Sequence, residues 1–254
     1  MQPVCHTLNK IMDAQSIDAL WQEWLRSMIE DYGFDRMLYG STRFATSQAL
    51  GNVGDYLMLT NYCHDYIREF VESELYLHGP MLKWAMENTG ACSWAYIAQF
   101  LMDADVSPKT QAVLDLNRKF GVVSGYTISF QPENERSRSA ISLAMNQNKS
   151  QAQVDAIWSE HGDDILLINK AAHTKSLTLP HTTVSGKRLT ARQREVLSWV
   201  SDGKTIQDIA KILNVSAPTV EKHLRLARET LGVETTAQAI LRLALQNQIF
   251  VYKA

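Results

Sequence analysis

The chain has few cysteines and no long hydrophobic run. Its three cysteines, Cys5, Cys63 and Cys92, are too few and too far apart for a disulfide scaffold or a zinc cluster, so we expect reduced thiols. No uncharged apolar segment approaches the roughly 18 residues that a membrane helix needs. The first ten residues lack the basic start and apolar stretch of a secretory signal. These absences predict a cytoplasmic protein that does not enter a membrane.

Common catalytic and cofactor-binding motifs are absent as well. The sequence contains no GxGxxG, P-loop, HExxH or GxSxG pattern. The triplet Cys63, His64 and Asp65 has the side-chain types of a nucleophile, a base and an orienting acid. Consecutive residues of a helix point in different directions, so these three cannot converge on one atom. We therefore expect no enzyme, no catalytic residue, no metal and no cofactor.

Charge is nearly balanced overall but unevenly distributed. Among 254 residues, 25 Lys and Arg stand against 27 Asp and Glu, a net charge of −2. From Lys187 onward there are 11 basic and 6 acidic residues, a net charge of +5, whereas residues 1–186 hold 14 and 21, a net charge of −7. The basic end indicates an anionic partner, although charge alone leaves chance unevenness open.

The segment between these two parts has the composition of a linker. It is rich in Thr and Ser, contains Pro180 and Gly186, and shows no helical or strand periodicity. We therefore predict one domain at residues 1–173, a linker at 174–187 and a second domain at 188–254.

The second domain is predicted to form four short helices. Three helix starts carry a capping box, in which a Thr is followed three positions later by Gln or Asp: Thr190 with Gln193, Thr205 with Asp208, and Thr235 with Gln238. Ser216 and Pro218 are suited to open the third helix, and Gly203 and Gly232 to end the first and the third.

The third helix has one apolar and one polar face. Its apolar residues recur at i, i+4, i+7 and i+11, namely Val220, Leu224, Ala227 and Leu231. A short helix, a tight turn and a second helix with an outward polar face form a helix-turn-helix, whose second helix can enter the ~12 Å wide major groove of DNA. A helical bundle with a solvated charged face fits the same pattern, so periodicity alone leaves both open.

Residues 189–233 resemble the DNA-binding domain of the LuxR family. The matching positions are Leu189, Thr190, Arg194, Glu195, Val196, Leu197, Trp199, Gly203, Lys204, Thr205, Ile209, Ala210, Leu213, Ser216, Thr219, Val220, His223, Leu224, Leu231 and Gly232. The resemblance implies base readout by Glu221 and Arg225, and phosphate contacts from the helix starts and nearby cations. The DNA-binding residues that we expect are Lys204, Thr205, Ser216, Thr219, Glu221, Lys222, Arg225 and Arg228.

The last helix is predicted over residues 237–245 and is apolar at Ile240, Leu241 and Ala244. In the LuxR family this helix helps to pair two DNA-binding modules. Ordinary core packing explains the same apolar residues, and both roles can hold together.

The first domain is predicted to be of the α+β class, a sandwich of helices on both faces of an antiparallel sheet. The pattern predicts helices at Ser16–Ile29 and Gln151–Ala172, three helical segments within about 62–120, and strands at Arg36–Gly40, Asp55–Thr60, Val122–Phe130 and Ala140–Met145. This order differs from the regular alternation of a doubly wound parallel fold such as a phospho-acceptor receiver domain.

The segment from Thr60 to Trp94 resembles the ligand-binding core of LuxR-type quorum-sensing regulators, which bind acyl-homoserine lactones. The resemblance implies an autoinducer-binding fold, and when aligned on Pro80 it implies a pocket. The ligand-binding residues that the resemblance implies are Tyr62, Tyr66, Phe70, Gly79, Trp94 and Gly125. We add Ser142 because its place on the second of two paired strands can face the pocket, although a surface position fits its pattern equally well.

Two of these positions depart from the family pattern. Gly79 stands where the family has an Asp that accepts the ligand's amide N–H, and Phe70 where it has a Tyr that donates to the acyl carbonyl. Each polar partner that is lost leaves a buried ligand group unpaired, at about 1–3 kcal/mol. We therefore expect a small hydrophobic signal other than an ordinary acyl-homoserine lactone, or no ligand; Glu74, Tyr76 and His78 are candidates to replace the lost acceptor.

Two functions remain open from the sequence. The first is a small-molecule-responsive transcription regulator that binds double-stranded operator DNA as a homodimer, with RNA polymerase as a further candidate partner. The second is a ligand-independent DNA-binding regulator whose first domain serves dimerisation or contact with another protein.

Overall fold

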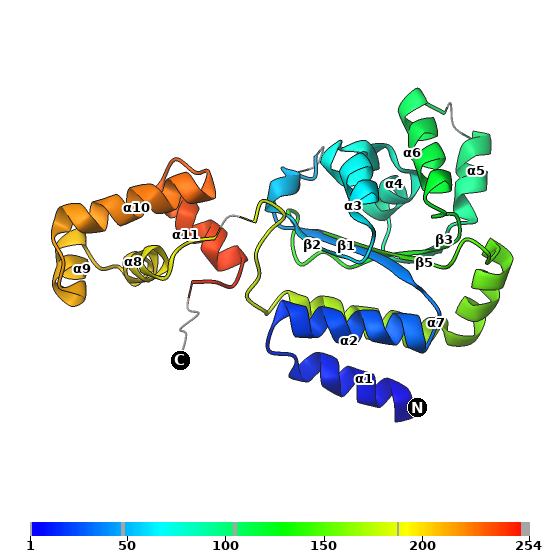
Figure 1. Cartoon of the computed structure of the whole chain (residues 1–254), viewed down its shortest axis with the longest axis horizontal. Helices are drawn as coiled ribbons and strands as arrows, with labels where there is room; N and C mark the ends of the chain where they lie inside the picture. Colours follow the sequence, from blue (N-terminus) through cyan, green and yellow to red (C-terminus); the bar gives the residue numbers. More distant parts are fainter. Residues whose placement is uncertain (1, 47–48, 104–105, 187, 250–254) are drawn as a thin grey trace. The chain divides into compact units, whose positions relative to one another are not determined.

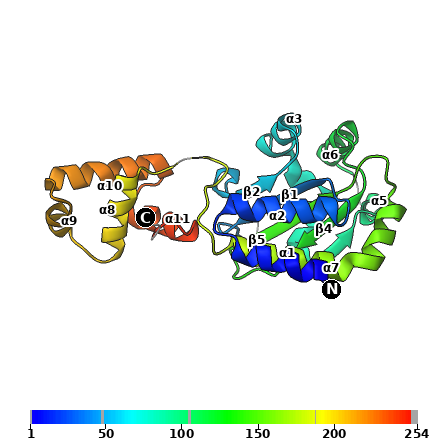
Figure 2. The same ribbon diagram turned by 60° about the horizontal axis from the view of Figure 1, so that its bottom comes forward.

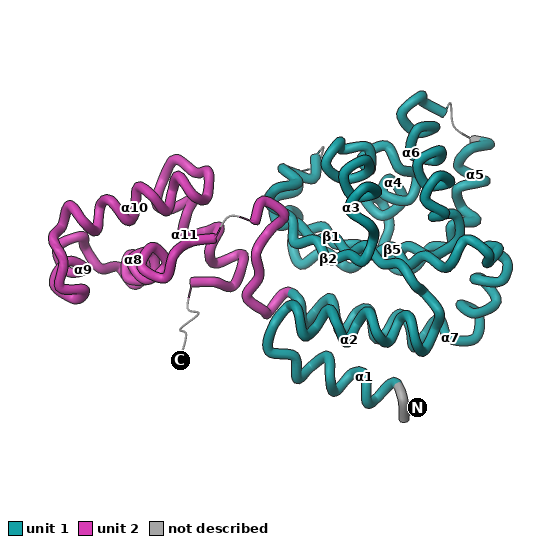
Figure 3. Tube along the Cα trace, viewed as in Figure 1, with its two compact units in different colours: residues 1–176 teal, residues 177–254 magenta. Residues whose placement is uncertain are grey.

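The structure, a computed structural model, describes residues 2–46, 49–103, 106–186 and 188–249. It forms two compact units, residues 1–176 and residues 177–254 (Figure 3). Within the described residues, no helix has both the length and the apolar character required to cross a membrane.

The first unit is built on a five-stranded antiparallel sheet. Its strands are β1 (Arg36–Thr42), β2 (Leu57–Thr60), β3 (Gly90–Ser93), β4 (Gly125–Ser129) and β5 (Arg138–Ala144), in the order β2-β1-β5-β4-β3. Helices lie on both faces of the sheet (Figure 1). The expected α+β sandwich with an antiparallel sheet is confirmed.

One face of the sheet is covered by α1 (Gln2–Asp13), α2 (Ile17–Glu30) and α7 (Gln151–Ser176), as Figures 1 and 2 show. The alternation of β1 directs the fully buried Met37 and Tyr39 into this layer. Trp24 of α2 packs against Tyr39, with ring centroids 5.1 Å apart. Its indole N–H donates to the Asn169 side chain of α7 at 2.9 Å, so this layer is closed by packing and by a satisfied polar pair.

The opposite face is covered by a series of helices of 4 to 12 residues. They are α3 (His64–Ile67), followed by a π-helical turn at Arg68–Glu72, and then α4 (Pro80–Glu87), α5 (Tyr96–Asp103) and α6 (Pro108–Lys119). Ser107 caps α6 by accepting from the Thr110 N–H at 3.1 Å.

Several elements differ from the sequence prediction. β3 lies within the stretch predicted to be wholly helical, because pairing with β4 overrides its weak local signal. The helix α1 was not predicted, and the predicted helix Gln151–Ala172 continues to Ser176, so residues 174–176 of the predicted linker are helical. The predicted strand Asp55–Thr60 begins only at Leu57, after a 3-10 turn at Val53–Asp55.

The second unit contains α8 (Ala191–Ser201), α9 (Ile206–Leu213), α10 (Ala217–Leu231) and α11 (Thr236–Leu245). All three predicted capping boxes are confirmed, at Thr190, Thr205 and Thr235. The predicted apolar stripe of α10 is buried at all four positions, and Gly232 ends the helix with φ 65. Ser216 holds the N-cap position of α10, but its hydroxyl bonds to the Thr219 hydroxyl at 2.8 Å instead of capping.

The first residues of this unit are bonded to its C-terminal turn. The Asn247 side chain donates to the carbonyls of Leu177 and Leu179, at 2.7 and 3.2 Å. The His181 N–H donates to the Gln246 carbonyl at 3.1 Å, and the Gln248 side chain donates to the His181 carbonyl. Residues 177–181, which lie within the predicted linker, are therefore part of the second unit.

Candidate functional site

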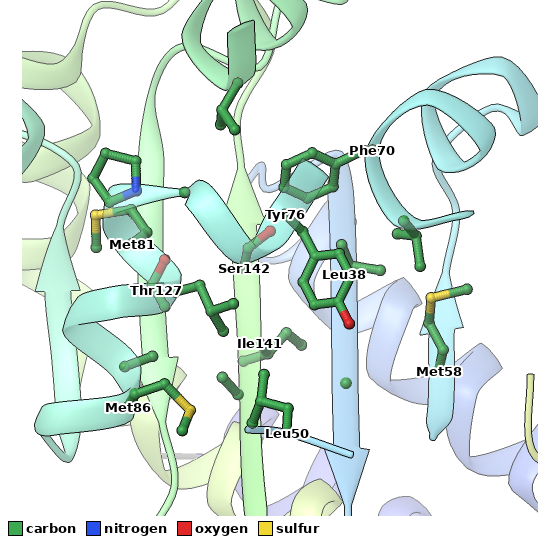
Figure 4. Close-up of a pocket in the computed structure, with 18 of the residues that line it drawn as sticks. Leu38, Leu50, Met58, Phe70, Tyr76, Met81, Met86, Thr127, Ile141 and Ser142 are labelled. Carbon is green, nitrogen blue, oxygen red and sulfur yellow. The ribbon is translucent and has the colours of Figure 1, made fainter. Parts of the chain in front are cut away.

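A cavity of about 200 Å³ lies between the sheet and the helices α3 to α6. Figure 4 shows residues of its wall, from β1, β4 and β5 on the floor and from the helical segments above. Most of the wall is apolar, and Met58, Met81 and Met86 are among its side chains. Methionine side chains adapt their shape, so the wall suits a flexible hydrophobic ligand.

Five of the seven predicted ligand-binding residues line this cavity, namely Tyr66, Phe70, Gly79, Trp94 and Ser142. Tyr62 and Gly125 are outside the lining set. Of the three candidates to replace the missing acceptor, Tyr76 lines the cavity, whereas Glu74 and His78 do not.

The two aromatic donors of the wall are bonded within the protein. The Tyr66 hydroxyl donates to the Asn117 side chain at 2.9 Å, and the Trp94 indole N–H donates to the Thr127 hydroxyl, also at 2.9 Å. Burial raises the pKa of Tyr66, so its phenol stays protonated as a donor. Both residues therefore shape the wall without leaving an unpaired donor in it.

Tyr62 supports the cavity from behind Tyr66. The two rings stack with centroids 4.6 Å apart, and Tyr66 stacks in turn on Phe70 at 5.0 Å. The Tyr62 hydroxyl is buried and has no hydrogen-bond partner among the described residues. Burial raises the pKa of Tyr62, and the nearby Arg36 and the Ser142 hydroxyl oppose that rise. The Tyr62 hydroxyl is therefore an unsatisfied polar group beside the wall.

Gly125 serves the sheet. A Cβ at this position would stand 2.2 Å from the Leu143 carbonyl oxygen on β5, so only glycine permits the observed approach of the two strands. The Gln151 side chain accepts from the Gly125 N–H at 2.9 Å and donates to its carbonyl at 3.1 Å. The structure therefore gives Gly125 a packing role between β4 and β5.

Sequence reasoning did not single out Tyr56 and Thr127, which also line the cavity. The Tyr76 hydroxyl donates to the Tyr56 hydroxyl across the cavity wall at 3.4 Å, and burial raises the pKa of Tyr56, so both phenols remain protonated. Thr127 lies directly opposite Ser142 in the β4–β5 register. Strand pairing could have pointed to Thr127 once Ser142 was chosen, whereas Tyr56 lies in a segment whose sequence carries no such signal.

The second candidate surface is formed by α9, the turn after it and α10. Thr205 opens α9, and its hydroxyl lies 2.6 Å from the Asp208 carboxylate and accepts from the Asp208 N–H at 3.2 Å. The hydrogen bonds that the Thr205 hydroxyl and backbone N–H donate to this carboxylate lower the pKa of Asp208. The Thr205 hydroxyl is thus engaged within its own helix, and its side chain and that of Lys204 are exposed.

The outward face of α10 carries the residues expected to read DNA. Glu221, Lys222 and Arg225 are exposed, and Arg225 forms an ion pair with Glu229 at 2.5 Å. Arg228 is half-buried and donates to the Thr236 hydroxyl at 3.0 Å, which joins α10 to α11. The exposed positions present charge on the side opposite the buried stripe, as a recognition helix requires.

The last helix, α11, has both an inner and an outer apolar face. Ala239 and Leu243 are fully buried in the core of the second unit. Leu241 is 51% exposed, and Ala237 and Ala244 are exposed as well. Core packing therefore accounts for only part of the apolar character of α11.

A hydrophobic cavity over an antiparallel sheet, joined to a helix-turn-helix unit, defines the class of ligand-sensing transcription regulators. Residues 16–176 match the autoinducer binding domain, and residues 187–243 match the luxR family of bacterial regulatory proteins. The chain belongs to this LuxR family of transcription regulators, as its sequence pattern predicted.

Named relatives agree with this assignment. The chain is 25% identical over 198 residues to the transcriptional activator protein EsaR of Pantoea stewartii, covering 74% of this chain and 78% of EsaR. It is 28% identical over 211 residues to the transcriptional activator protein YukR of Yersinia ruckeri, covering 78% and 88% of the two chains. Both relatives are named transcriptional activators, which agrees with the predicted transcription regulator.

Solved structures share the fold. Escherichia coli SdiA superimposes with a TM-score of 0.54 at 15% identity, covering 98% of this chain and 99% of SdiA. CepR2 of Burkholderia cenocepacia, an N-acylhomoserine lactone dependent LuxR family transcription factor, gives a TM-score of 0.52 at 14% identity, covering 68% of this chain and 93% of that chain.

Proposed function

We propose that this LuxR-type regulator senses a small, uncharged hydrophobic signal in the cavity of its first unit and binds operator DNA as a homodimer. The proposed sensor is residues 1–173, and the proposed DNA-binding domain is residues 188–254. The observation that carries the proposal is the methionine-rich cavity, whose wall includes five of the expected ligand-binding residues.

The proposed signal is not an ordinary acyl-homoserine lactone. Gly79 brings no side chain to the wall, and Phe70 brings no hydroxyl. Tyr66 and Trp94 already donate to Asn117 and Thr127, so binding a lactone through them would first require breaking those bonds. If either donor turned to the lactone, its present acceptor, Asn117 or Thr127, would be left unpaired in a buried site, and binding would be weaker for that reason.

The proposed DNA contacts lie on the outer face of α10 and at the start of α9. Arg225 and Glu221 read base edges in the major groove, and Arg225 leaves Glu229 to do so. The remaining expected residues contact phosphates and hold the register on the duplex: Lys204, Thr205, Ser216, Thr219, Lys222 and Arg228.

The proposed dimer pairs two copies of α11 through the exposed Ala237, Leu241 and Ala244. Dimerisation doubles the number of DNA contacts and favours an operator with partial two-fold symmetry. The relatives are named transcriptional activators, which supports RNA polymerase as a further partner. The proposed place of action is the cytoplasm.

A ligand-independent regulator is the second candidate. The satisfied hydrogen bonds of Tyr66 and Trp94 favour it, because they let the wall persist without a bound molecule. In that case the first unit serves dimerisation or contact with another protein.

A ligand-extraction experiment separates the two candidates. The full chain is purified from its own host, denatured and extracted, and the extract is analysed by mass spectrometry and added back to protein refolded without it. We expect one hydrophobic compound to co-purify, to raise the melting temperature and to change the affinity for a selected operator. Extracts that leave both quantities unchanged favour the ligand-independent regulator. A marked rise in melting temperature with low micromolar acyl-homoserine lactone contradicts the proposed signal class.

A further inference from the structure

The charge of the cavity wall limits the ligands that it can bind. Among the described residues that line it, Arg138 is the only one with a formal charge. Its guanidinium donates to the carbonyls of Glu135 and Ser137, at 3.3 and 2.6 Å. The described wall contains no carboxylate, so a cationic ligand would find no counter-charge there.

The floor of the cavity presents two neighbouring hydroxyls. Thr127 on β4 and Ser142 on β5 are direct register partners, and Figure 4 shows their oxygens on the same side of the sheet. Thr127 accepts from the Trp94 indole N–H, which leaves its own proton to donate. The Ser142 hydroxyl lies close enough to the buried Tyr62 hydroxyl to oppose the rise in the pKa of Tyr62, and Ser142 keeps a proton of its own to donate.

These hydroxyls favour a ligand that accepts hydrogen bonds. Side by side on paired strands, two hydroxyl donors can bind the two lone pairs of one carbonyl oxygen. The other hydroxyls of the wall are less available, because Ser41 and Ser139 bond to each other at 2.8 Å and Tyr76 donates to Tyr56. The Thr127–Ser142 pair is therefore the preferred place for a ligand carbonyl.

Near Gly79, the described wall places no side-chain acceptor for a ligand N–H group within 4 Å of a Cβ at that position. At Gly79, the polar atom nearest to a Cβ would be the Tyr76 carbonyl oxygen, at 3.1 Å. That oxygen already accepts from the Gly79 N–H at 3.0 Å. A secondary amide is planar and trans, so its N–H points away from its carbonyl. An amide whose carbonyl lies on the floor therefore turns its N–H toward the helical side.

We propose that the cavity selects a neutral acyl ester over the corresponding acyl amide, with the ester carbonyl bound by the Thr127 and Ser142 hydroxyls. This inference rests on the proposed sensing function and specifies the chemical class of the signal. The ester oxygen carries no proton, so its binding leaves no donor unpaired, whereas the amide N–H loses its bond to water without replacement.

The test uses two synthetic probes that differ at one position. 2-Hydroxyethyl octanoate and N-(2-hydroxyethyl)octanamide have the same chain and head group, and only the ester oxygen is replaced by N–H. Their dissociation constants for the purified full chain are measured by calorimetry. We expect the ester to bind roughly 5- to 150-fold more tightly, the range that one unpaired buried donor produces.

Two variants assign the preference to the named residues. Ser142→Ala should weaken ester binding about 5-fold or more, through loss of one hydroxyl donor, and Ser159→Ala on an exposed face of α7 is the matched control. Gly79→Asp puts a carboxylate on the helical side and should shift the preference toward the amide. Gly79→Ala controls for the added Cβ.

Equal binding of the two probes, or tighter binding of the amide, overturns the inference and leaves hydrophobic sensing intact. Failure of both probes to bind overturns it as well. The proposed function fails separately, when host extracts neither stabilise the chain nor alter its DNA affinity. If Gly79→Asp does not fold, the ester-to-amide ratio of the unaltered chain and the Ser142→Ala result still decide the matter.

Discussion

The side-chain amide of Asn247 donates to the backbone carbonyl of Leu177 at 2.7 Å. Asn247 has a φ of 53, a left-handed conformation in which its short side chain can turn back toward the incoming chain. Since α7 ends at Ser176, the very next residue is already bonded within the second unit. Residues 177–181, which follow the autoinducer binding domain in the chain, are therefore held by hydrogen bonds to the C-terminal turn of the second unit.

We predict that Asn247→Gly loosens this junction. Glycine keeps the left-handed backbone and removes two side-chain hydrogen bonds, so the second unit should lose about 1–2 kcal/mol of unfolding free energy. Hydrogen exchange at residues 177–181 should accelerate while α10 stays protected. Asn214→Gly is the matched control, because Asn214 has a φ of 51 and its side chain bonds to no other described residue. Equal effects of the two substitutions would contradict a role for the Asn247 amide.

We predict that Gly125→Ala strongly destabilises the first unit. Its Cβ would stand 2.2 Å from the Leu143 carbonyl oxygen, so β4 and β5 must separate, at about 3 kcal/mol or more. Gly40→Ala on β1 meets no atom within 4 Å and serves as the control for stability alone, because Gly40 lines the cavity; we expect little change in its unfolding free energy. Urea unfolding of the full chain measures both. If Gly125→Ala changed the unfolding free energy little but altered ligand binding, the result would contradict this prediction and support the pocket role that the resemblance implied for Gly125.

We predict different DNA-binding defects for two neighbouring cations of α10. Arg225→Ala should weaken binding to the selected operator about 10-fold or more and leave binding to unrelated DNA nearly unchanged, because it removes base readout. Lys222→Ala should weaken binding to both and reduce the salt dependence by the equivalent of about one phosphate contact. Lys170→Ala, an exposed cation in the first unit, is the control for net charge. If Arg225→Ala kept the same preference for the operator over unrelated DNA, base readout would have to be assigned to another residue.

We predict that Asp155 makes the first unit sensitive to acid. Burial acts to raise the pKa of this carboxyl, but hydrogen bonds from Ser93 and Gln151, at 2.7 and 2.9 Å, outweigh it and lower the pKa below its ordinary 3.8. A lowered pKa stabilises the folded state above the unfolded-state value, and this stability disappears as the pH falls through the folded-state value.

Asp155→Asn should therefore cost about 1–2 kcal/mol at neutral pH, and the difference from the unaltered chain should shrink as the pH falls below 3.8. Denaturant unfolding at neutral and acid pH measures the difference in unfolding free energy between the two chains. Asp163→Asn, an exposed position on the same helix, is the control and should show no such dependence. A difference that stays constant with pH would show that the carboxylate charge is not responsible.

The structure of the second unit could be predicted from its sequence to a greater extent than that of the first unit. The helix starts at Thr190, Thr205 and Thr235 and the buried stripe of α10 follow from local spacing, because capping and helical periodicity involve residues a few positions apart. In the first unit, β3 escaped prediction because its stability comes from pairing with β4, about 35 residues later in the chain.

The cavity was only partly predictable for the same reason. Resemblance to a family pointed to Tyr66, Phe70, Gly79 and Trp94, and the predicted strand pairing pointed to Ser142; all five line the cavity. It could not indicate that the Tyr66 and Trp94 donors are bonded to Asn117 and Thr127, because those partners lie 51 and 33 positions away.

The sequence by itself determined the family, the two-part organisation and the four capped helices, since these depend on motifs and contacts within short segments. Only the tertiary structure decided that Gly125 packs strands, that Tyr62 lies behind the wall and that Thr127 and Ser142 adjoin on the floor. Those facts depend on the register of strands and the approach of distant segments, which local residue patterns do not encode.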